Sequence, residues 1–90
     1  SDVYKRQGYT YIRMGEYKNA IKHLNRSLYL FEKLGEPRGQ FYGLNGIGLC
    51  SFYTNNFKDA IIDLEECKKM QDEIVSKEIL IETSTLHIKV

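Results

Sequence analysis

The fold of this chain is decided by a stretch that occurs twice. Residues 15–24 read Gly-Glu-Tyr-Lys-Asn-Ala-Ile-Lys-His-Leu, and residues 55–64 read Asn-Asn-Phe-Lys-Asp-Ala-Ile-Ile-Asp-Leu. The same offset of 40 residues pairs Gly8 with Gly48. Self-similarity at a fixed spacing is typical of repeat proteins. Each copy is therefore expected to be one structural unit, and a partial third copy is expected from about Ile79.

Within each copy the apolar residues recur with helical spacing. Steps of three and four residues place them on one face of a helix. In the first copy they are Tyr17, Ala20, Ile21, Leu24, Leu28 and Phe31; in the second they are Phe57, Ala60, Ile61, Leu64 and Cys67. No stretch alternates with period two, so no strand is expected.

Residues that suit turns mark the breaks between helices. Gly15 tolerates positive φ, and Asn55 can take that role in the second copy. Gly35 is a helix stop, Pro37 suits a first helical turn, and Ser76 can cap a last helix. Five helical segments are therefore expected: 3–14, 17–34, 37–53, 56–74 and 77–90.

These segments predict an all-α protein built of tandem antiparallel helix pairs. The expected units are a first repeat over 8–36, a second over 37–75, and the first helix of a truncated third over 76–90. Residues 1–7 are set apart, because Asp2 to Gln7 back-translates to a string that resembles the end of a sequencing adaptor. The C-terminus stops inside an apolar pattern and also suggests truncation.

Composition excludes several classes of protein. The 90 residues carry 13 bases and 12 acids, and 11 of each once residues 1–7 are set aside. Residues 41–90 hold five bases and eight acids, so an RNA-binding repeat is disfavoured. No apolar run approaches the roughly 20 residues of a membrane span. Two cysteines and the lack of a recognisable signal peptide favour the cytoplasm, although a cut N-terminus leaves a leader open.

The two copies resemble the tetratricopeptide repeat. The first offers Gly8-x2-Tyr11-x3-Gly15-x-Tyr17-x2-Ala20-x3-Leu24, and the second offers Gly48 followed by Phe57-x2-Ala60-x3-Leu64-x2-Cys67. The family's Trp and final Pro are missing, and the period of 40 exceeds its usual 34. The longer spacing is similar to that of bacterial peptide-sensing regulators and signalling proteins, and of some eukaryotic adaptors.

The resemblance implies a right-handed α-solenoid whose first helices line a concave groove that binds a peptide, a partner protein or another domain. Helix geometry gives the groove candidates as Tyr9, Ile12, Arg13, Tyr42, Asn45, Leu49, Phe52 and Tyr53, with Ser84 and Ile88 in the third copy. Asn45 is the preferred contact, because an amide donates to and accepts from a peptide backbone, and related repeats carry an Asn near that place. Arg13 can pair with a carboxylate.

The repeat-packing motif is expected at Gly8, Tyr11, Gly15, Tyr17, Ala20, Leu24, Gly48, Phe57, Ala60, Leu64 and Cys67. Cys50 and Cys67 lack metal-ligand spacing, and a buried reduced thiol is expected at Cys67. His23 is expected on an exposed face and His87 at a packing position. No metal, cofactor or catalytic group is expected.

The sequence thus favours a non-catalytic scaffold that binds proteins or peptides. The alternative is a regulatory input segment of a signalling protein, such as a kinase, a cyclase or a transcriptional regulator, whose output domain is missing. Fold alone does not separate the two.

Overall fold

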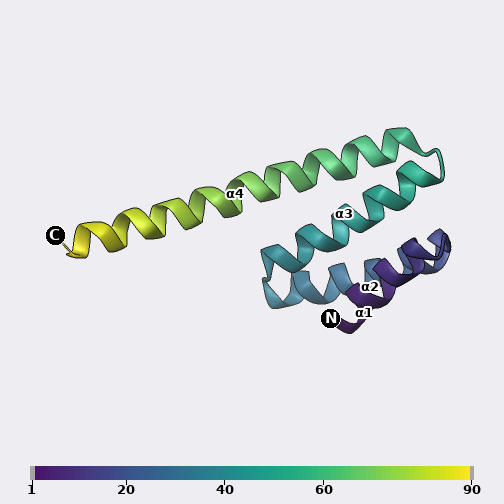
Figure 1. Cartoon of the computed structure of the whole chain (residues 1–90), viewed down its shortest axis with the longest axis horizontal. Helices are drawn as coiled ribbons and strands as arrows, with labels where there is room; N and C mark the ends of the chain where they lie inside the picture. Colours follow the sequence, from purple (N-terminus) through teal and green to yellow (C-terminus); the bar gives the residue numbers. More distant parts are fainter. Residues whose placement is uncertain (1, 90) are drawn as a thin grey trace.

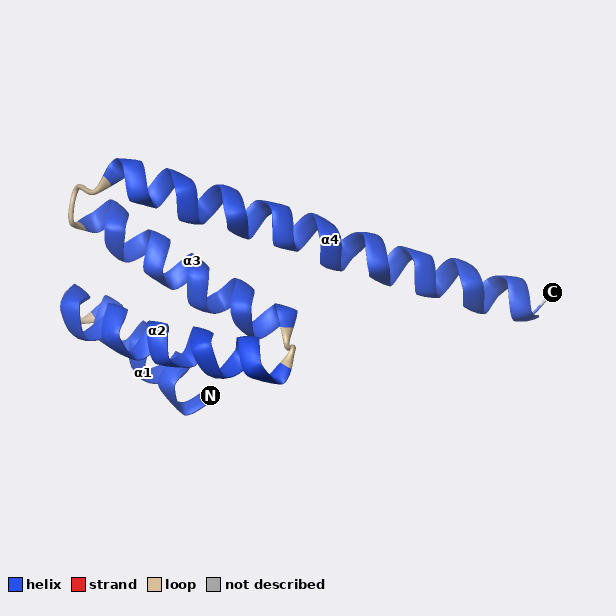
Figure 2. Cartoon of the chain, turned by 180° about the vertical axis from the view of Figure 1, so that it is seen from behind, coloured by secondary structure: helices blue, strands red, loops and turns tan. Residues whose placement is uncertain are grey.

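The computed structural model describes the backbone of residues 2–89 and the side-chain surroundings of residues 3–79. The described chain is all helix and short turn, without a strand (Figure 2). The helices are α1 (Asp2–Arg13), α2 (Tyr17–Leu34), α3 (Pro37–Tyr53) and α4 (Phe57–Lys89). The predicted all-α class is confirmed, and the first three helices agree with their expected bounds to within one residue.

Consecutive helices run antiparallel and stack in a row (Figure 1). Helix α2 packs against α1 and α3, and α3 packs against α2 and α4. Helix α1 also touches α3, whereas no comparable contact joins α2 to α4 in the described part of the chain. The first helices of the two pairs, α1 and α3, therefore form one continuous layer.

The core sits where α1, α2 and α3 converge on Leu24. Ala20, Leu24 and Cys50 are fully buried. A Cβ atom added at Gly8 of α1 would lie 2.5 Å from Leu24 Cγ, and one added at Gly46 of α3 would lie 2.7 Å from Leu24 Cδ1. Because glycine has no side chain, Gly8 and Gly46 let the backbones of α1 and α3 approach Leu24 closely. Apolar side chains packed around this core are Tyr9, Tyr11, Ile12, Tyr17, Ile21 and Ile47.

The turns use left-handed backbone where the sequence predicts it. Gly15 has φ 76° and Gly35 has φ 65°. Asn55 takes φ 67° at the position equivalent to Gly15, because asparagine is among the few side chains that tolerate this region. The Gly35 N–H donates to the Glu32 carbonyl at 3.1 Å, and Pro37 begins α3.

The expected break between residues 74 and 77 is wrong, because α4 runs without interruption from Phe57 to Lys89. Val75 stands 40 residues after Gly35, and Lys77 stands 40 after Pro37. A β-branched side chain is strongly disfavoured in the left-handed region, and lysine is a good helix former. The second copy therefore lacks the stop that ends α2.

The uninterrupted helix makes the molecule elongated. Its extents are 53 × 27 × 21 Å and its radius of gyration is 15.5 Å, against about 12 Å for a compact domain of this length. The distal half of α4 extends beyond the other helices (Figure 1). The assignment of residues 76–90 to a third repeat stays a prediction.

Candidate functional site

A hydrogen-bonded junction joins α1 to α3 in their shared layer. The Tyr9 hydroxyl donates to the Tyr42 carbonyl at 2.7 Å and lies 3.4 Å from Asn45 Nδ2, which donates to it. Burial raises the pKa of Tyr9, although the Asn45 hydrogen bond acts in the opposite direction. The hydroxyl therefore stays protonated and remains a donor at neutral pH.

The surface beside this junction is aromatic and accessible. The Tyr42 side chain is 46% exposed, and Lys5 Nζ lies 4.8 Å from the centroid of its ring. Among the described residues, the Asn45 side chain makes the single hydrogen bond to Tyr9. Its second N–H and its carbonyl oxygen can therefore serve a ligand.

A second aromatic group lies at the other end of α3. Tyr53 stacks on Tyr17 of α2, with ring centroids 5.5 Å apart and an interplanar angle of 16°. Phe52 meets Phe57 of α4 edge to face at 5.7 Å. Phe52, Tyr53 and Phe57 are each about half exposed. The aromatic rings thus continue from α3 onto the start of α4.

The structure divides the expected groove residues between two environments. Ile12 packs against the core, and Leu49 is half-buried. Arg13 is exposed in the last turn of α1. The more accessible candidates are Tyr42, Phe52 and Tyr53. Ser84 and Ile88 lie outside the residues whose side chains are described.

Most of the expected packing residues occupy buried sites. Gly8, Ala20, Leu24, Gly48, Ala60 and Cys67 are buried. Tyr11 and Tyr17 are half-buried against the core, and Leu64 is half-buried on α4. Gly15 lies in an exposed turn.

Two of these expectations need correction. Phe57 is 52% exposed, whereas its counterpart Tyr17 is covered by the Tyr53 ring; no helix of the described chain covers Phe57 in the same way. His23 is half-buried rather than exposed, because its ring lies 5.0 Å from the Tyr11 ring. The side-chain surroundings of His87 lie outside the described residues.

Both thiols are free and buried. Burial raises the pKa of Cys67 to about 11, and the nearby carboxylates of Asp63 and Glu66 add to the effect. The Cys67 thiol donates to the Phe41 carbonyl with Sγ 3.6 Å from the oxygen. Burial also raises the pKa of Asp63, with a smaller contribution from Asp59.

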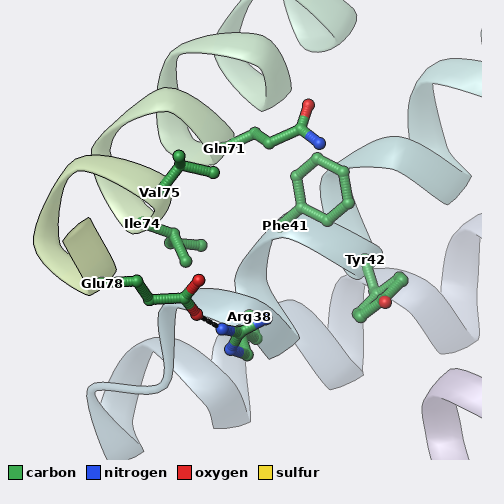
Figure 3. Close-up of a pocket in the computed structure, with 7 residues that line it drawn as sticks. All are labelled: Arg38, Phe41, Tyr42, Gln71, Ile74, Val75 and Glu78. Carbon is green, nitrogen blue, oxygen red and sulfur yellow. Dashed lines mark ion pairs between the residues drawn. The ribbon is translucent and has the colours of Figure 1, made fainter. Parts of the chain in front are cut away.

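Sequence reasoning missed a pocket between α3 and α4. Its volume is about 150 Å³, and an ion pair between Arg38 and Glu78 closes one end (Figure 3). Its other lining residues are Phe41, Tyr42, Gln71, Ile74 and Val75. The pocket was not predicted because a helix break was expected at 74–77. A turn there would place Val75 and Glu78 away from α3. A prediction that continued the helix past residue 74 would have placed Glu78 one turn after Ile74 and so indicated the pocket.

No group of three or more His, Cys, Asp or Glu side chains among the described residues is placed to hold a metal ion. Within the same residues, no helix combines the length and the apolar character needed to cross a bilayer.

Antiparallel helix pairs that repeat along the chain and contact only their neighbours define a helical repeat protein. The tetratricopeptide repeat family model matches residues 1–73, and the chain therefore belongs to that family. Neither the curated proteins nor the solved structures gave a match. As a tetratricopeptide repeat, the chain is a module of the kind that mediates protein–protein interaction.

Proposed function

We propose that the layer formed by α1 and α3 binds a peptide segment of a partner protein, and that the chain acts as a non-catalytic scaffold. The observation that carries the proposal is the junction of Tyr9, Tyr42 and Asn45. It fixes the Asn45 amide through the Tyr9 hydroxyl, three residues along α3 from Tyr42, whose ring is exposed.

The polar part of the junction suits a peptide backbone. Asn45 is held in place by its hydrogen bond to Tyr9, so a ligand that contacts it meets a side chain already restricted in rotation. Restriction before binding lowers the entropy lost on binding. A backbone N–H or C=O of the peptide can hydrogen-bond to the remaining atoms of the Asn45 amide, whatever side chain the peptide residue carries.

The apolar part of the site suits a side chain of the same peptide. Tyr42 takes part in the junction through its carbonyl and lines the pocket with Phe41, Ile74 and Val75. Figure 3 draws Phe41, Ile74 and Val75 around this pocket, with the Arg38–Glu78 pair at its edge. A peptide held at Asn45 can therefore place an apolar side chain between α3 and α4.

The proposal is tested with a phage-displayed library of random peptides. Peptides enriched on the unmodified chain are measured by fluorescence polarisation against the double variant Asn45→Ala with Tyr42→Ala. Loss of one hydrogen bond and one aromatic contact is worth about 2–3 kcal/mol, so affinity is expected to fall roughly 30- to 150-fold. Helicity by circular dichroism should be unchanged.

The matched control is Asn25→Ala with Tyr29→Ala, which removes the same kinds of side chain from exposed positions on α2. This control should bind the peptides as the unmodified chain does. Enriched peptides that bind both double variants equally, or a library that yields none, would contradict the groove assignment.

We further propose a cytoplasmic location and a peptide or protein ligand rather than a nucleic acid, a membrane or a metal ion. A regulatory input role in a bacterial-type signalling protein is compatible with the same groove, with the peptide as the signal. Reading the source DNA beyond both ends of this frame separates an adaptor from such an input.

A further inference from the structure

The second helix pair presents a face that the first pair keeps covered. The end face consists of Leu49 and Phe52 on α3 and Phe57, Ile61 and Leu64 on α4. Forty residues earlier, the corresponding positions in α1 and α2 are Tyr9, Ile12, Tyr17, Ile21 and Leu24, all of which belong to the core or pack against it. On the end face Phe52 is 50%, Phe57 52% and Ile61 57% exposed.

The structure shows what covers this face in the first pair. Helix α3 places Ile47 and Cys50 against the core and stacks the Tyr53 ring on Tyr17. The α3·α4 pair has no such helix in the described chain, since α4 continues straight past residue 75. The end face therefore exposes a contiguous apolar surface, which in a soluble protein commonly marks an interaction site.

Head-to-tail stacking of copies is disfavoured by the residues of α1. The α1 positions equivalent to Ile47, Cys50 and Tyr53 are Gln7, Thr10 and Arg13. All three are exposed. Docking them on the end face would bury an arginine and two polar groups against Phe52 and Ile61, which costs free energy unless each finds a partner.

The charges beside the end face are instead self-complementary. Lys58 and Glu65 flank Ile61 at three and four residues, so all three share one side of α4. Lys58 and Glu65 are exposed. When two α4 helices pack antiparallel about a two-fold axis near Ile61, Lys58 of each copy lies beside Glu65 of the other. In a two-fold symmetric contact of this kind, the pair of Lys58 and Glu65 occurs twice.

We propose that the end face binds a second copy of this chain, with the two α4 helices antiparallel about a two-fold axis near Ile61. Leu49 and Phe52 lie on both the end face and the expected groove. Ile61, Lys58 and Glu65, whose variants test this contact, lie outside the groove, and Asn45 and Tyr42 lie outside the end face. Failure of the dimer contact would leave the peptide proposal untouched.

Sedimentation equilibrium tests the first part of the proposal. The unmodified chain should reach twice the 10.5 kDa mass of one chain. Ile61→Glu should raise the dimer dissociation constant at least 100-fold. The matched control is Ile62→Glu, since Ile62 is 60% exposed on the adjacent position of the same helix. Helicity by circular dichroism confirms that both variants fold.

Charge reversal tests the antiparallel arrangement. Lys58→Glu and Glu65→Lys should each weaken self-association about three- to tenfold, because each places like charges together twice. Mixing the two single variants should restore a heterodimer, in which every pair is again opposite in sign.

Three outcomes would overturn the proposal. They are a chain that stays at monomer mass up to about 1 mM, assemblies that grow beyond two copies, or a dimer that Ile61→Glu and Ile62→Glu affect equally. A mixture of the charge variants no tighter than either alone would overturn the antiparallel arrangement.

Discussion

Replacing Gly46 with alanine should destabilise the chain, whereas the same change at Gly43 should not. Both glycines are buried in the middle of α3. A Cβ at Gly43 would lie 3.3 Å from Leu28 Cβ, a tight contact that a shift of a few tenths of an ångström relieves. At Gly46 it would lie 2.7 Å from Leu24 Cδ1. Leu24 is fully buried and is blocked on its other side by α1, so it cannot move aside.

The magnitude follows from two opposing terms. Alanine improves helix propensity by about 1 kcal/mol relative to glycine at either position. Overpacking a closed core costs about 1–3 kcal/mol. Gly43→Ala should therefore change the free energy of unfolding by between zero and about +1 kcal/mol. Gly46→Ala should lower it by as much as about 2 kcal/mol.

Urea unfolding followed by circular dichroism at neutral pH measures this difference. The two variants should differ by about 1–3 kcal/mol, or roughly 4–20 °C in melting temperature. Equal stability of the two variants would refute the reasoning, because it would mean that Leu24 has free space around it.

Two further predictions concern a turn and a thiol. Gly35→Val should destabilise the chain by about 1–2 kcal/mol in urea unfolding, because Gly35 has φ 65°, which is left-handed backbone. Gly35→Asn should lose less stability, and equal losses would argue against a backbone cause. Stability should also depend on pH through Cys67, whose folded pKa of about 11 lies above its ordinary value of 9.0. The neutral thiol is favoured by folding, so stability should be level below pH 9 and fall as the pH rises from 9 through 11. The dependence of the urea midpoint on pH should be weaker in Cys67→Ala, with Cys50 and Tyr9 contributing the remaining slope in the same direction. A midpoint that rises with pH would contradict this sign.

The helices could be predicted because periodicity and turn chemistry agree with each other. Gly15 and Gly35 occur where the apolar spacing ends, and both take positive φ in the structure. The end of α4 could not be predicted in this way. Ser76 is a good cap in isolation, but a cap needs a preceding stop, and Val75 does not supply one.

Only part of the candidate site could be predicted from the sequence. Asn45 and Tyr42 could be placed on one helix face from spacing alone. Their link to Tyr9 depends on how closely α1 approaches α3, which the glycines of both helices determine. The pocket beside Tyr42 depends on α4 continuing past Ile74, and no local pattern indicates that length.

The glycines of α3 have a consequence for how the chain folds. Four of its 17 residues are buried glycines, Gly39, Gly43, Gly46 and Gly48, and each weakens an isolated helix by about 1 kcal/mol relative to alanine. Helix α3 therefore has little tendency to form alone and becomes helical only when α2 and α4 enclose it. Its amide protons should exchange with solvent mainly through global unfolding, because opening α3 separates the two helix pairs. The helix with the weakest intrinsic propensity thus makes folding cooperative along the whole repeat.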